Sequence, residues 1–176
     1  MHVHLETERL ILRRFTPDNV DLATALDADP AVMRYINGGR PTPRDEIRDV
    51  YLPSWIAYYE AGDRYGFWAA IEKRTGAFLG WFHLRPREGD PDDEPELGYR
   101  LIASSWGRGY ATEGSRALIR QAFTGLGVRR VYAMTMVVNV ASRRVWRRPD
   151  SASSGSSTSR GRTGSKARST ATSSTP

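Results

Sequence analysis

The residue composition changes abruptly after Trp146. From Arg147 to Pro176 the chain contains no Val, Leu, Ile, Met, Phe, Tyr or Trp, and half of these thirty residues are Ser or Thr. Such a segment cannot bury enough apolar surface to offset the conformational entropy that an ordered chain loses. We therefore predict one folded domain, residues 1–146, followed by a disordered Ser/Thr/Arg-rich tail, residues 147–176.

The tail also carries most of the net charge. It holds six basic residues and one acid, and so five of the six net positive charges of the chain. The high isoelectric point therefore does not indicate that the folded part binds nucleic acid. We expect no nucleic-acid partner, and a basic-tailed nucleic-acid-binding protein is the alternative from another functional class.

The sequence contains no cysteine, which excludes disulfides, thiolate metal ligands and a cysteine nucleophile. His2, His4 and His83 are the only histidines, so we expect no metal site. We expect the first two to lie in a loose terminus. The opening residues have no apolar signal core, and no run approaches the roughly 18–20 apolar residues of a membrane span. We therefore expect a cytoplasmic protein with no membrane partner.

Hydrophobic periodicity predicts a mixed α/β domain with one central crossover. The pattern predicts a strand over Arg9–Phe15, helices over residues 16–29 and 30–36, and a third helix over residues 44–62 that Pro53 interrupts. A hairpin follows over residues 65–86. The remaining elements are a strand over Glu96–Ala103, a loop and helix over residues 104–127, a strand over Val128–Asn139 and a final helix over residues 140–146.

Two glycines, Gly107 and Gly109, lie between a predicted strand and an amphipathic helix. Such a loop can direct several backbone N–H groups toward one point, and the start of the helix adds a partial positive charge. The loop lacks both the Gly-Lys-Ser/Thr of an NTPase P-loop and the three-glycine dinucleotide fingerprint. The pattern favours a phosphate-binding loop, and a plain tight turn is the alternative.

Three stretches carry a resemblance to the GNAT acyl-CoA N-acyltransferase superfamily. "LETERLILRRFTPDNVDLATALDADPAVMRYI" resembles the opening of its Rim-type ribosomal-protein N-terminal acetyltransferases. "ELGYRLIASSWGRGYATEGSRALIRQAF" resembles their acetyl-CoA core, and "VNVASRRV" their Asn-x-x-Ser segment. The resemblance implies a mixed-sheet α/β acyltransferase fold, here without its last two strands. It also implies acetyl-CoA as cosubstrate, no metal, and a primary amine as acceptor, either a protein N-terminus or a small molecule.

The resemblance further implies which residues hold the cosubstrate. The pantetheine arm would lie along Leu101, Ile102 and Ala103, and Ser104 stands where many members have Gln or Arg. Asn139 would contact the cofactor or position the reacting groups, with Ser142 in the same segment. The pyrophosphate would lie on backbone amides of the loop: Trp106, Gly107, Arg108, Gly109, Tyr110 and Ala111.

The implied reaction is direct attack of an amine on a thioester, and the amine must first lose a proton. Glu96 is the candidate base, and a solvated acid beside the acidic loop of residues 89–94 is the alternative reading. A backbone N–H of Leu101–Ala103 is expected to stabilise the oxyanion, and Tyr99 is expected to be a packed core ring. The candidate acceptor-binding rings, for which plain core packing is the alternative, are Tyr35, Trp55, Phe67 and Trp81.

In the resembled family two more strands follow the Asn-x-x-Ser helix. Back-translation of Val145–Asp150 with G/C-rich codons, read from the third base, spells Met-Glu-Lys-Ala-Gly, which resembles the family's continuation. We hypothesise that a one-base deletion near Val145 produced the tail. The loss would leave an edge of Val131–Val138 unpaired, favour a homodimer and impair turnover. A non-catalytic acyl-CoA-binding remnant is the second alternative.

Overall fold

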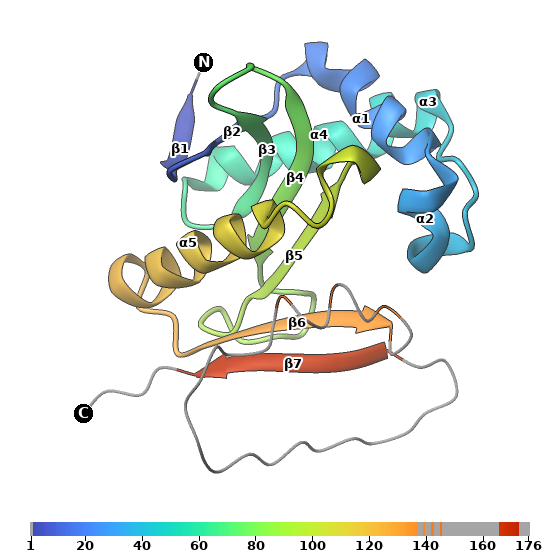
Figure 1. The fold of residues 1–176 in the computed structure, drawn as a ribbon. Coiled ribbons are helices and arrows are strands. Elements are labelled where there is room, and N and C mark those ends of the chain that lie inside the picture. The colour runs from blue at the N-terminus through green and yellow to red at the C-terminus, as the bar shows by residue number, and fades with distance from the viewer. Residues whose placement is uncertain (1, 137–138, 140–141, 143–144, 146–165, 173–176) are drawn as a thin grey trace.

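The computed structural model describes residues 2–136, 139, 142, 145 and 166–172. A single sheet of seven strands runs through the molecule, and its strand order follows the chain from β1 to β7. Helices α1 to α4 cover one face of this sheet, and α5 covers the other (Figure 1). The predicted mixed α/β class is therefore confirmed.

The strands are β1 (Val3–Glu6), β2 (Leu10–Arg14), β3 (Gly66–Glu72), β4 (Phe78–Arg85), β5 (Glu96–Leu101), β6 (Arg130–Met136) and β7 (Lys166–Thr172). The helices are α1 (Val20–Ala28), α2 (Pro30–Asn37), α3 (Arg44–Glu46), α4 (Leu52–Ala57) and α5 (Tyr110–Gly125). A π-helical turn, Ile47–Tyr51, joins α3 to α4 just before Pro53. Proline cannot donate the N–H of a regular helical turn, so the wider turn explains the predicted interruption.

Side chains that alternate along β3 and β4 separate two apolar cores, because successive residues of a strand point to opposite faces. Trp68 and Phe82 pack in the core beneath α5. Phe67 and Trp81 pack on the other face, in the core beneath α1 to α4. At Gly114 of α5, an added Cβ would lie 2.4 Å from the Phe82 ring, so the absence of a side chain lets α5 approach β4 closely.

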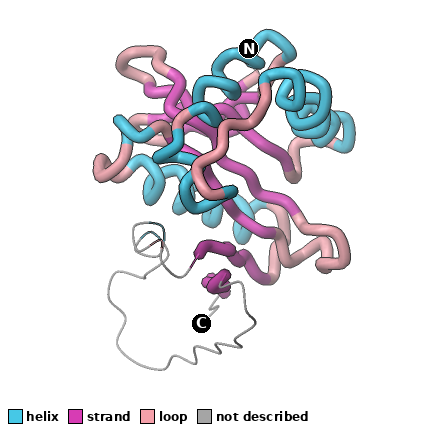
Figure 2. The backbone as a smooth tube through the Cα atoms, turned by 90° about the vertical axis from the view of Figure 1, so that its right-hand side faces the viewer, coloured by secondary structure: helices cyan, strands magenta, loops and turns pink. Residues whose placement is uncertain are grey.

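Strands β5 and β6 are parallel but share one register pair, Glu96 with Tyr132. Beyond that pair β6 turns away from β5, as Figures 1 and 2 show from two directions. On the β6 side of β5, the Tyr132 N–H donates to Pro95 O (3.1 Å). On the opposite side, which faces β4, the Ile102 N–H donates to Leu79 O (2.9 Å). Strand alternation therefore directs the N–H groups of Tyr99 and Leu101 toward the side that β6 has left.

The N-terminus differs from the expected loose segment. Val3 pairs with Arg13 and Leu5 with Leu12, so that residues Val3–Glu6 form an outer strand of the sheet. The His4 ring stacks on Trp68 with centroids 3.9 Å apart. The prediction was wrong because this strand is short and is stabilised by pairing and stacking with residues distant in the sequence.

The tail differs from prediction at one place. Lys166–Thr172 pairs antiparallel with Arg130–Met136, so the predicted unpaired edge of β6 and a wholly disordered tail are both wrong for these residues. Backbone pairing needs no apolar side chain, and the free N–H and C=O groups of an edge strand favour any extended partner. The other tail residues, 147–165 and 173–176, lie outside the described residues, as do residues 137–138, 140–141, 143–144 and 146.

Candidate active site

The connection from β5 to α5 is a tightly bonded loop. Gly107 and Gly109 have φ of +70° and +84°, a left-handed conformation that glycine adopts without strain. The Trp106 indole donates to Leu101 O (2.8 Å), and the Ser105 hydroxyl donates to Ile102 O (2.7 Å). These bonds fix the path of the chain into Tyr110, the first residue of α5.

The loop has the donor set that a diphosphate requires. The first N–H groups of a helix have no partner within it, and they add to the positive end of the helix dipole. An added Cβ on Gly107 would meet nothing within 4 Å, whereas one on Gly109 would lie 3.2 Å from Arg9 Nη2, so the open side of this turn is at Gly107. The Arg108 side chain is half exposed beside them. The predicted cofactor-binding residues Trp106–Ala111 form this turn and the start of α5, which we call the cradle, and their binding of the acetyl-CoA phosphates stays a prediction.

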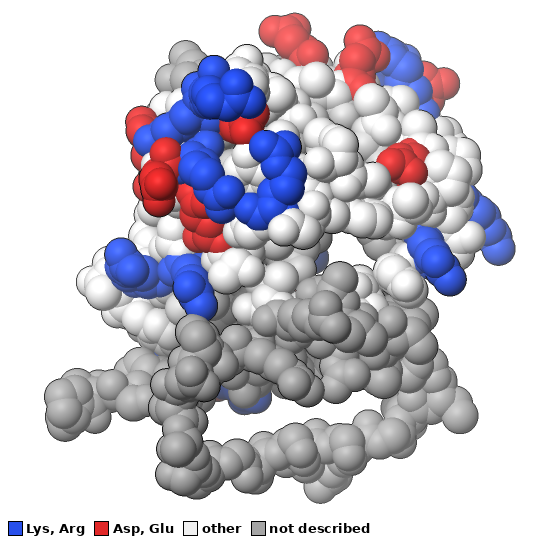
Figure 3. Space-filling model, in the orientation of Figure 1, with Lys and Arg blue, Asp and Glu red and all other residues white. Residues whose placement is uncertain are grey.

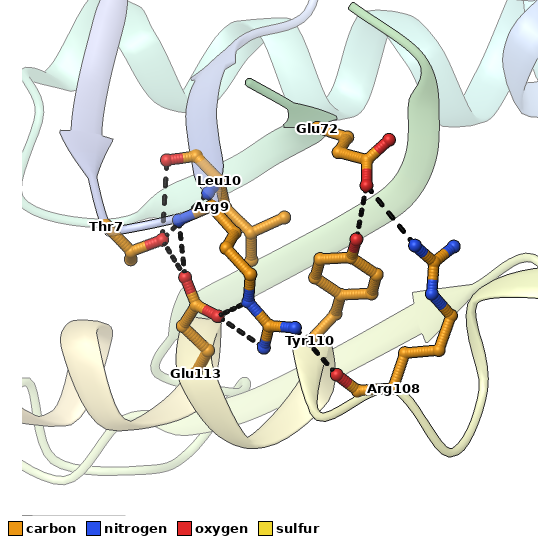
Figure 4. Close-up of polar contacts among 7 residues, drawn as sticks. All are labelled: Thr7, Arg9, Leu10, Glu72, Arg108, Tyr110 and Glu113. Carbon is orange, nitrogen blue, oxygen red and sulfur yellow. Dashed lines mark hydrogen bonds and ion pairs between the residues drawn. The ribbon is translucent and has the colours of Figure 1, made fainter. Parts of the chain in front are cut away.

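Tyr110 anchors this loop to β3. Its ring lies between the guanidinium groups of Arg9 and Arg108, at 4.5 and 5.0 Å from the ring centroid. The Tyr110 hydroxyl donates to Glu72, and Arg108 Nη2 lies 3.4 Å from Glu72 Oε1 (Figure 4). Hydrogen bonds from Thr75 and Tyr110 hold the pKa of Glu72 below its ordinary value, so Glu72 is a stable anion beneath the loop.

Glu113 anchors the first turn of α5 to the β1–β2 connection. Its Oε1 accepts from the Thr7 hydroxyl (2.6 Å) and the Arg9 backbone N–H (2.8 Å), and its Oε2 accepts from Arg9 Nε (2.6 Å; Figure 4). Burial raises the pKa of Glu113, but the bonds from Thr7 and Arg9 outweigh it and lower that pKa. Arg9 Nη1 also donates to Arg108 O (2.9 Å), which ties the loop itself to this cluster.

The charges near β1 to β3 are of both signs. On the face drawn in Figure 3, Lys and Arg side chains are interspersed with Asp and Glu over these strands. Lys73 Nζ, for example, lies 2.7 Å from Glu6 Oε2. That part of the face therefore lacks the uniform basic surface that nucleic-acid binding requires.

Glu96 begins β5 on the face that α1 to α4 cover, and its side chain is 13% exposed. Its Oε2 lies 4.0 Å from His83 Nε2 and 3.8 Å from Arg87 Nε. The structure thus places this carboxylate among neighbouring side chains rather than in solvent. Burial, helped by Arg85, Arg100 and Arg87, lowers the pKa of His83 to about 3, so the imidazole is neutral and a weak base.

An ion pair on this face was not predicted. Arg100 of β5 pairs with Asp27 of α1, and both side chains are largely buried. The guanidinium carbon of Arg100 lies 5.0 Å from the centre of a Trp81 ring. This pair joins the helical layer to β5 on the same face as Glu96.

Three of the four predicted acceptor-binding rings form one cluster. The Trp55, Phe67 and Trp81 ring centroids lie 5.3 to 5.7 Å apart, and all three side chains are buried in the core beneath α1 to α4. Tyr35 of α2 is half-buried beneath Arg34 and has no ring contact with the cluster among the described residues. A role of these rings in acceptor binding stays a prediction.

Asn139 and Ser142 come together as the sequence spacing implies. The Ser142 backbone N–H donates to Asn139 Oδ1 (3.0 Å), as at the start of a helix. The Tyr99 hydroxyl lies 3.3 Å from Ser142 Oγ, so the segment after β6 reaches back to β5. Tyr99 also packs on Phe82, and burial raises its pKa, which agrees with the expected core ring.

Within the described residues no helix is long and apolar enough to cross a membrane, and no three His, Asp or Glu side chains group as a metal site. The chain is 34% identical over 148 residues to the FsC-acetyl coenzyme A-N(2)-transacetylase of Aspergillus fumigatus. This match covers 80% of the chain but 61% of that relative's length. The uncharacterized protein YkkB of Bacillus subtilis is 32% identical over 142 residues, which is 80% of each chain.

Among solved structures, the RimL ribosomal L7/L12 α-N-protein acetyltransferase in complex with coenzyme A superposes with a TM-score of 0.74 at 18% identity. That superposition covers 97% of this chain and 98% of the other, and it shows the shared fold. The sequence model of the GNAT acetyltransferase domain matches residues 9–149. The chain therefore belongs to the GNAT acetyltransferase family, whose class of activity is acetyl-CoA-dependent N-acetylation.

Proposed function

We propose that this protein transfers the acetyl group of acetyl-CoA to a primary amine by direct attack on the thioester. The observation that carries the proposal is the divergence of β6 from β5 beside the Gly107–Gly109 loop. Past Glu96 no described β6 residue pairs with β5, so the N–H groups of Tyr99 and Leu101 point away from β4 without a ladder partner on β6, next to the proposed diphosphate cradle. A bound thioester would lie along β5 between this cradle and Glu96.

The residues of the chain would act in sequence. The N–H of Leu101 or Tyr99 donates to the thioester oxygen as negative charge develops there, because the Ile102 N–H is already bonded to Leu79 O. Glu96 takes the proton of the attacking amine, directly or through one water molecule. The C–N bond forms, the C–S bond then breaks, and coenzyme A leaves as a thiolate that is protonated by water or by the acid form of Glu96, which regenerates the carboxylate. Asn139 and Ser142 would position the groups near the sulfur.

The acceptor is proposed as an amine in general. One relative is named for transfer to an N(2) position, and one structural neighbour is named for acetylating the α-N of a ribosomal protein. Both names support an amine acceptor, and they leave small molecules and protein N-termini open. We also propose a cytoplasmic location, since acetyl-CoA in the cytoplasm would supply the reaction.

The test is a thiol-release assay on the full chain with a panel of primary amines. The chain has no cysteine, so a thiol reagent detects only released coenzyme A. Glu96→Gln is expected to lower kcat by roughly 100-fold, a typical contribution of a general base, while the Kd for acetyl-CoA stays the same. A kcat of E96Q equal to that of the wild type would contradict the role of Glu96 as the general base. Acetyl-CoA binding without transfer to any amine would favour the non-catalytic remnant.

A further inference from the structure

Three side chains on the α1–α4 face of β4 and β5 present buried nitrogens that have no hydrogen-bond partner among the described residues. They are Trp81 Nε1, both ring nitrogens of His83, and Arg100 Nε. Trp81 and His83 are 7% and 8% exposed. A buried donor without a partner costs about 1–3 kcal/mol, so three in one place are unusual in a folded core.

The three groups lie next to one another. The Trp81 and His83 rings are stacked with centroids 5.7 Å apart, and the Arg100 guanidinium lies 5.0 Å from a Trp81 ring. Trp81 pairs in register with Arg100, and His83 with Gly98. A Cβ on Gly98 would lie 2.7 Å from His83 Nε2, so the imidazole packs directly against the β5 backbone at Gly98. We call Trp81, His83 and Arg100 the donor cluster.

The chemistry of the donor cluster selects its ligand. An indole N–H, a guanidinium Nε–H and one N–H of a neutral imidazole are all donors, and together they suit an oxygen-bearing group. Asp27 accepts a hydrogen bond from Nη1 of Arg100, and the Nε–H on the other side of the guanidinium has no described acceptor. A guanidinium forms stronger, charge-assisted hydrogen bonds with a carboxylate than with a neutral group. A carboxylate would therefore be stabilised here more than a neutral carbonyl.

The donor cluster lies beside the proposed base. Glu96 Oε2 is 4.0 Å from His83 Nε2. In an α-amino acid the amino nitrogen is only two bonds from the carboxylate carbon, so its two polar groups are similarly close together. We propose that the donor cluster binds the carboxylate of the acceptor and so places the neighbouring amine at Glu96. The acceptor class is then a primary amine that carries a carboxylate, as α-amino acids do. This inference rests on the proposed acetyl transfer.

The kinetic test compares amino acids with the amines that decarboxylation would leave. The pairs are L-phenylalanine with 2-phenylethylamine, L-leucine with isopentylamine, and L-lysine with cadaverine, and L-phenylalaninamide separates charge from carbonyl oxygen. At least one amino acid is expected to exceed its amine by 10-fold or more in kcat/KM, because unpaired polar groups of a site discriminate strongly. Equal kcat/KM within every pair, or an amide as good as its acid, would overturn the proposal.

Trp81→Phe keeps a ring in the core and removes one donor, so it should reduce that preference about 5- to 10-fold. Trp68→Phe is the matched control. Its indole nitrogen is also buried without a described partner, but it lies on the opposite face of the sheet. W68F should keep the full preference. If both variants lose it equally, the cause is structural and the donor cluster is not the carboxylate site.

A binding readout separates this inference from the proposed function. In a chain with 15N-labelled tryptophan, the Trp81 indole N–H signal, assigned by its loss in W81F, should shift on titration with the preferred amino acid. The Trp68 signal and titrations with the matched amine should show no shift. A Trp81 shift without any acetyl transfer would support the carboxylate site and contradict the proposed function. Acetyl transfer with an unmoved Trp81 signal would support the proposed function and contradict the carboxylate site.

Discussion

The N-terminal end of α5 and the donor cluster lie on opposite faces of the same strands, and their polar side chains are paired very differently. At the end of α5, Thr7, Arg9, Glu72, Tyr110 and Glu113 all bond to protein groups. In the donor cluster, Trp81, His83 and Arg100 keep buried nitrogens without described partners. Side chains that are already bonded can fix a backbone surface, whereas unbonded ones can bind a ligand themselves. On the proposed function, this difference predicts that the cosubstrate is recognised by a preorganised backbone and the acceptor by side chains.

The largest expected effect comes from straining the cradle. Gly109→Val places a β-branched residue at φ +84°, with its Cβ 3.2 Å from Arg9 Nη2, so the loop must move. We expect the Kd for acetyl-CoA, measured by calorimetry, to rise roughly 100-fold. Gly127→Val is the matched control, because φ is +63° there and nothing lies within 4 Å of its Cβ. It should lower stability and leave that Kd alone, and equal Kd values in both variants would contradict the cradle.

A smaller effect is expected from the anchor behind the loop. Arg9→Met removes the bonds to Glu113 and to Arg108 O, and it should cost about 2 kcal/mol of unfolding free energy and raise the acetyl-CoA Kd about 10-fold. Replacing both partners, in R9M/E113Q, should restore stability but not affinity, because no unpaired charge is left and the amide oxygen still accepts from Thr7 and the Arg9 N–H. Denaturant unfolding and calorimetry measure the two effects.

Arg48 provides the comparison for that anchor. It pairs with Asp45 and Asp49 in solvent, so Arg48→Met should leave the unfolding free energy unchanged within the error of denaturant unfolding. A double variant of Arg9 and Glu113 that regains acetyl-CoA affinity together with stability would show that the anchor only supports the fold.

The last expected effect is a pH slope of stability that belongs to the donor cluster. The folded pKa of His83 is about 3, below its unfolded value of 6.5, because of burial and of Arg85, Arg100 and Arg87, while Glu96 opposes them at 4.0 Å. The unfolded chain therefore binds a proton first, and stability falls as the pH drops below 6.5. Between pH 7.5 and 5.0 the loss should be about 2 kcal/mol for this group.

His83→Gln should remove that part of the slope in denaturant unfolding. His4, whose pKa burial also lowers, adds to the slope in the same direction, so His4→Gln is the companion variant. Carboxylates contribute mainly at lower pH and should be unaffected. An unchanged slope in H83Q would contradict the neutral, buried imidazole on which the donor cluster depends.

Local features of the site could be predicted from the sequence, and distant pairings could not. Gly107 and Gly109 reveal a left-handed loop by themselves, and Asn139 and Ser142 are three residues apart. Arg9 and Glu113 are 104 residues apart, and Arg100 and Asp27 are 73 apart, so no sequence pattern connects either pair. The same reason explains why β1 and β7 were not predicted, since both depend on distant partners.

The one-base deletion that would explain the composition of the tail stays a hypothesis about the gene. Pairing of Lys166–Thr172 with β6 supplies an edge partner, but it does not explain the loss of apolar residues after Trp146. Re-sequencing across the Val145 codon tests the proposed one-base deletion. A restored frame that reads Met-Glu-Lys-Ala-Gly would support it. An independent isolate whose gene encodes the printed tail in an intact frame would contradict it.

The most direct test of the central claim is a thermal melt of the full 176-residue chain with and without acetyl-CoA. A ligand that binds only the folded state stabilises it by about 2.7 kcal/mol at one hundred times its Kd. We predict a cooperative melt whose midpoint rises with acetyl-CoA in the wild type and does not rise in G109V. A cooperative wild-type melt that ignores acetyl-CoA would contradict the claim that the Gly107–Gly109 cradle holds the cosubstrate.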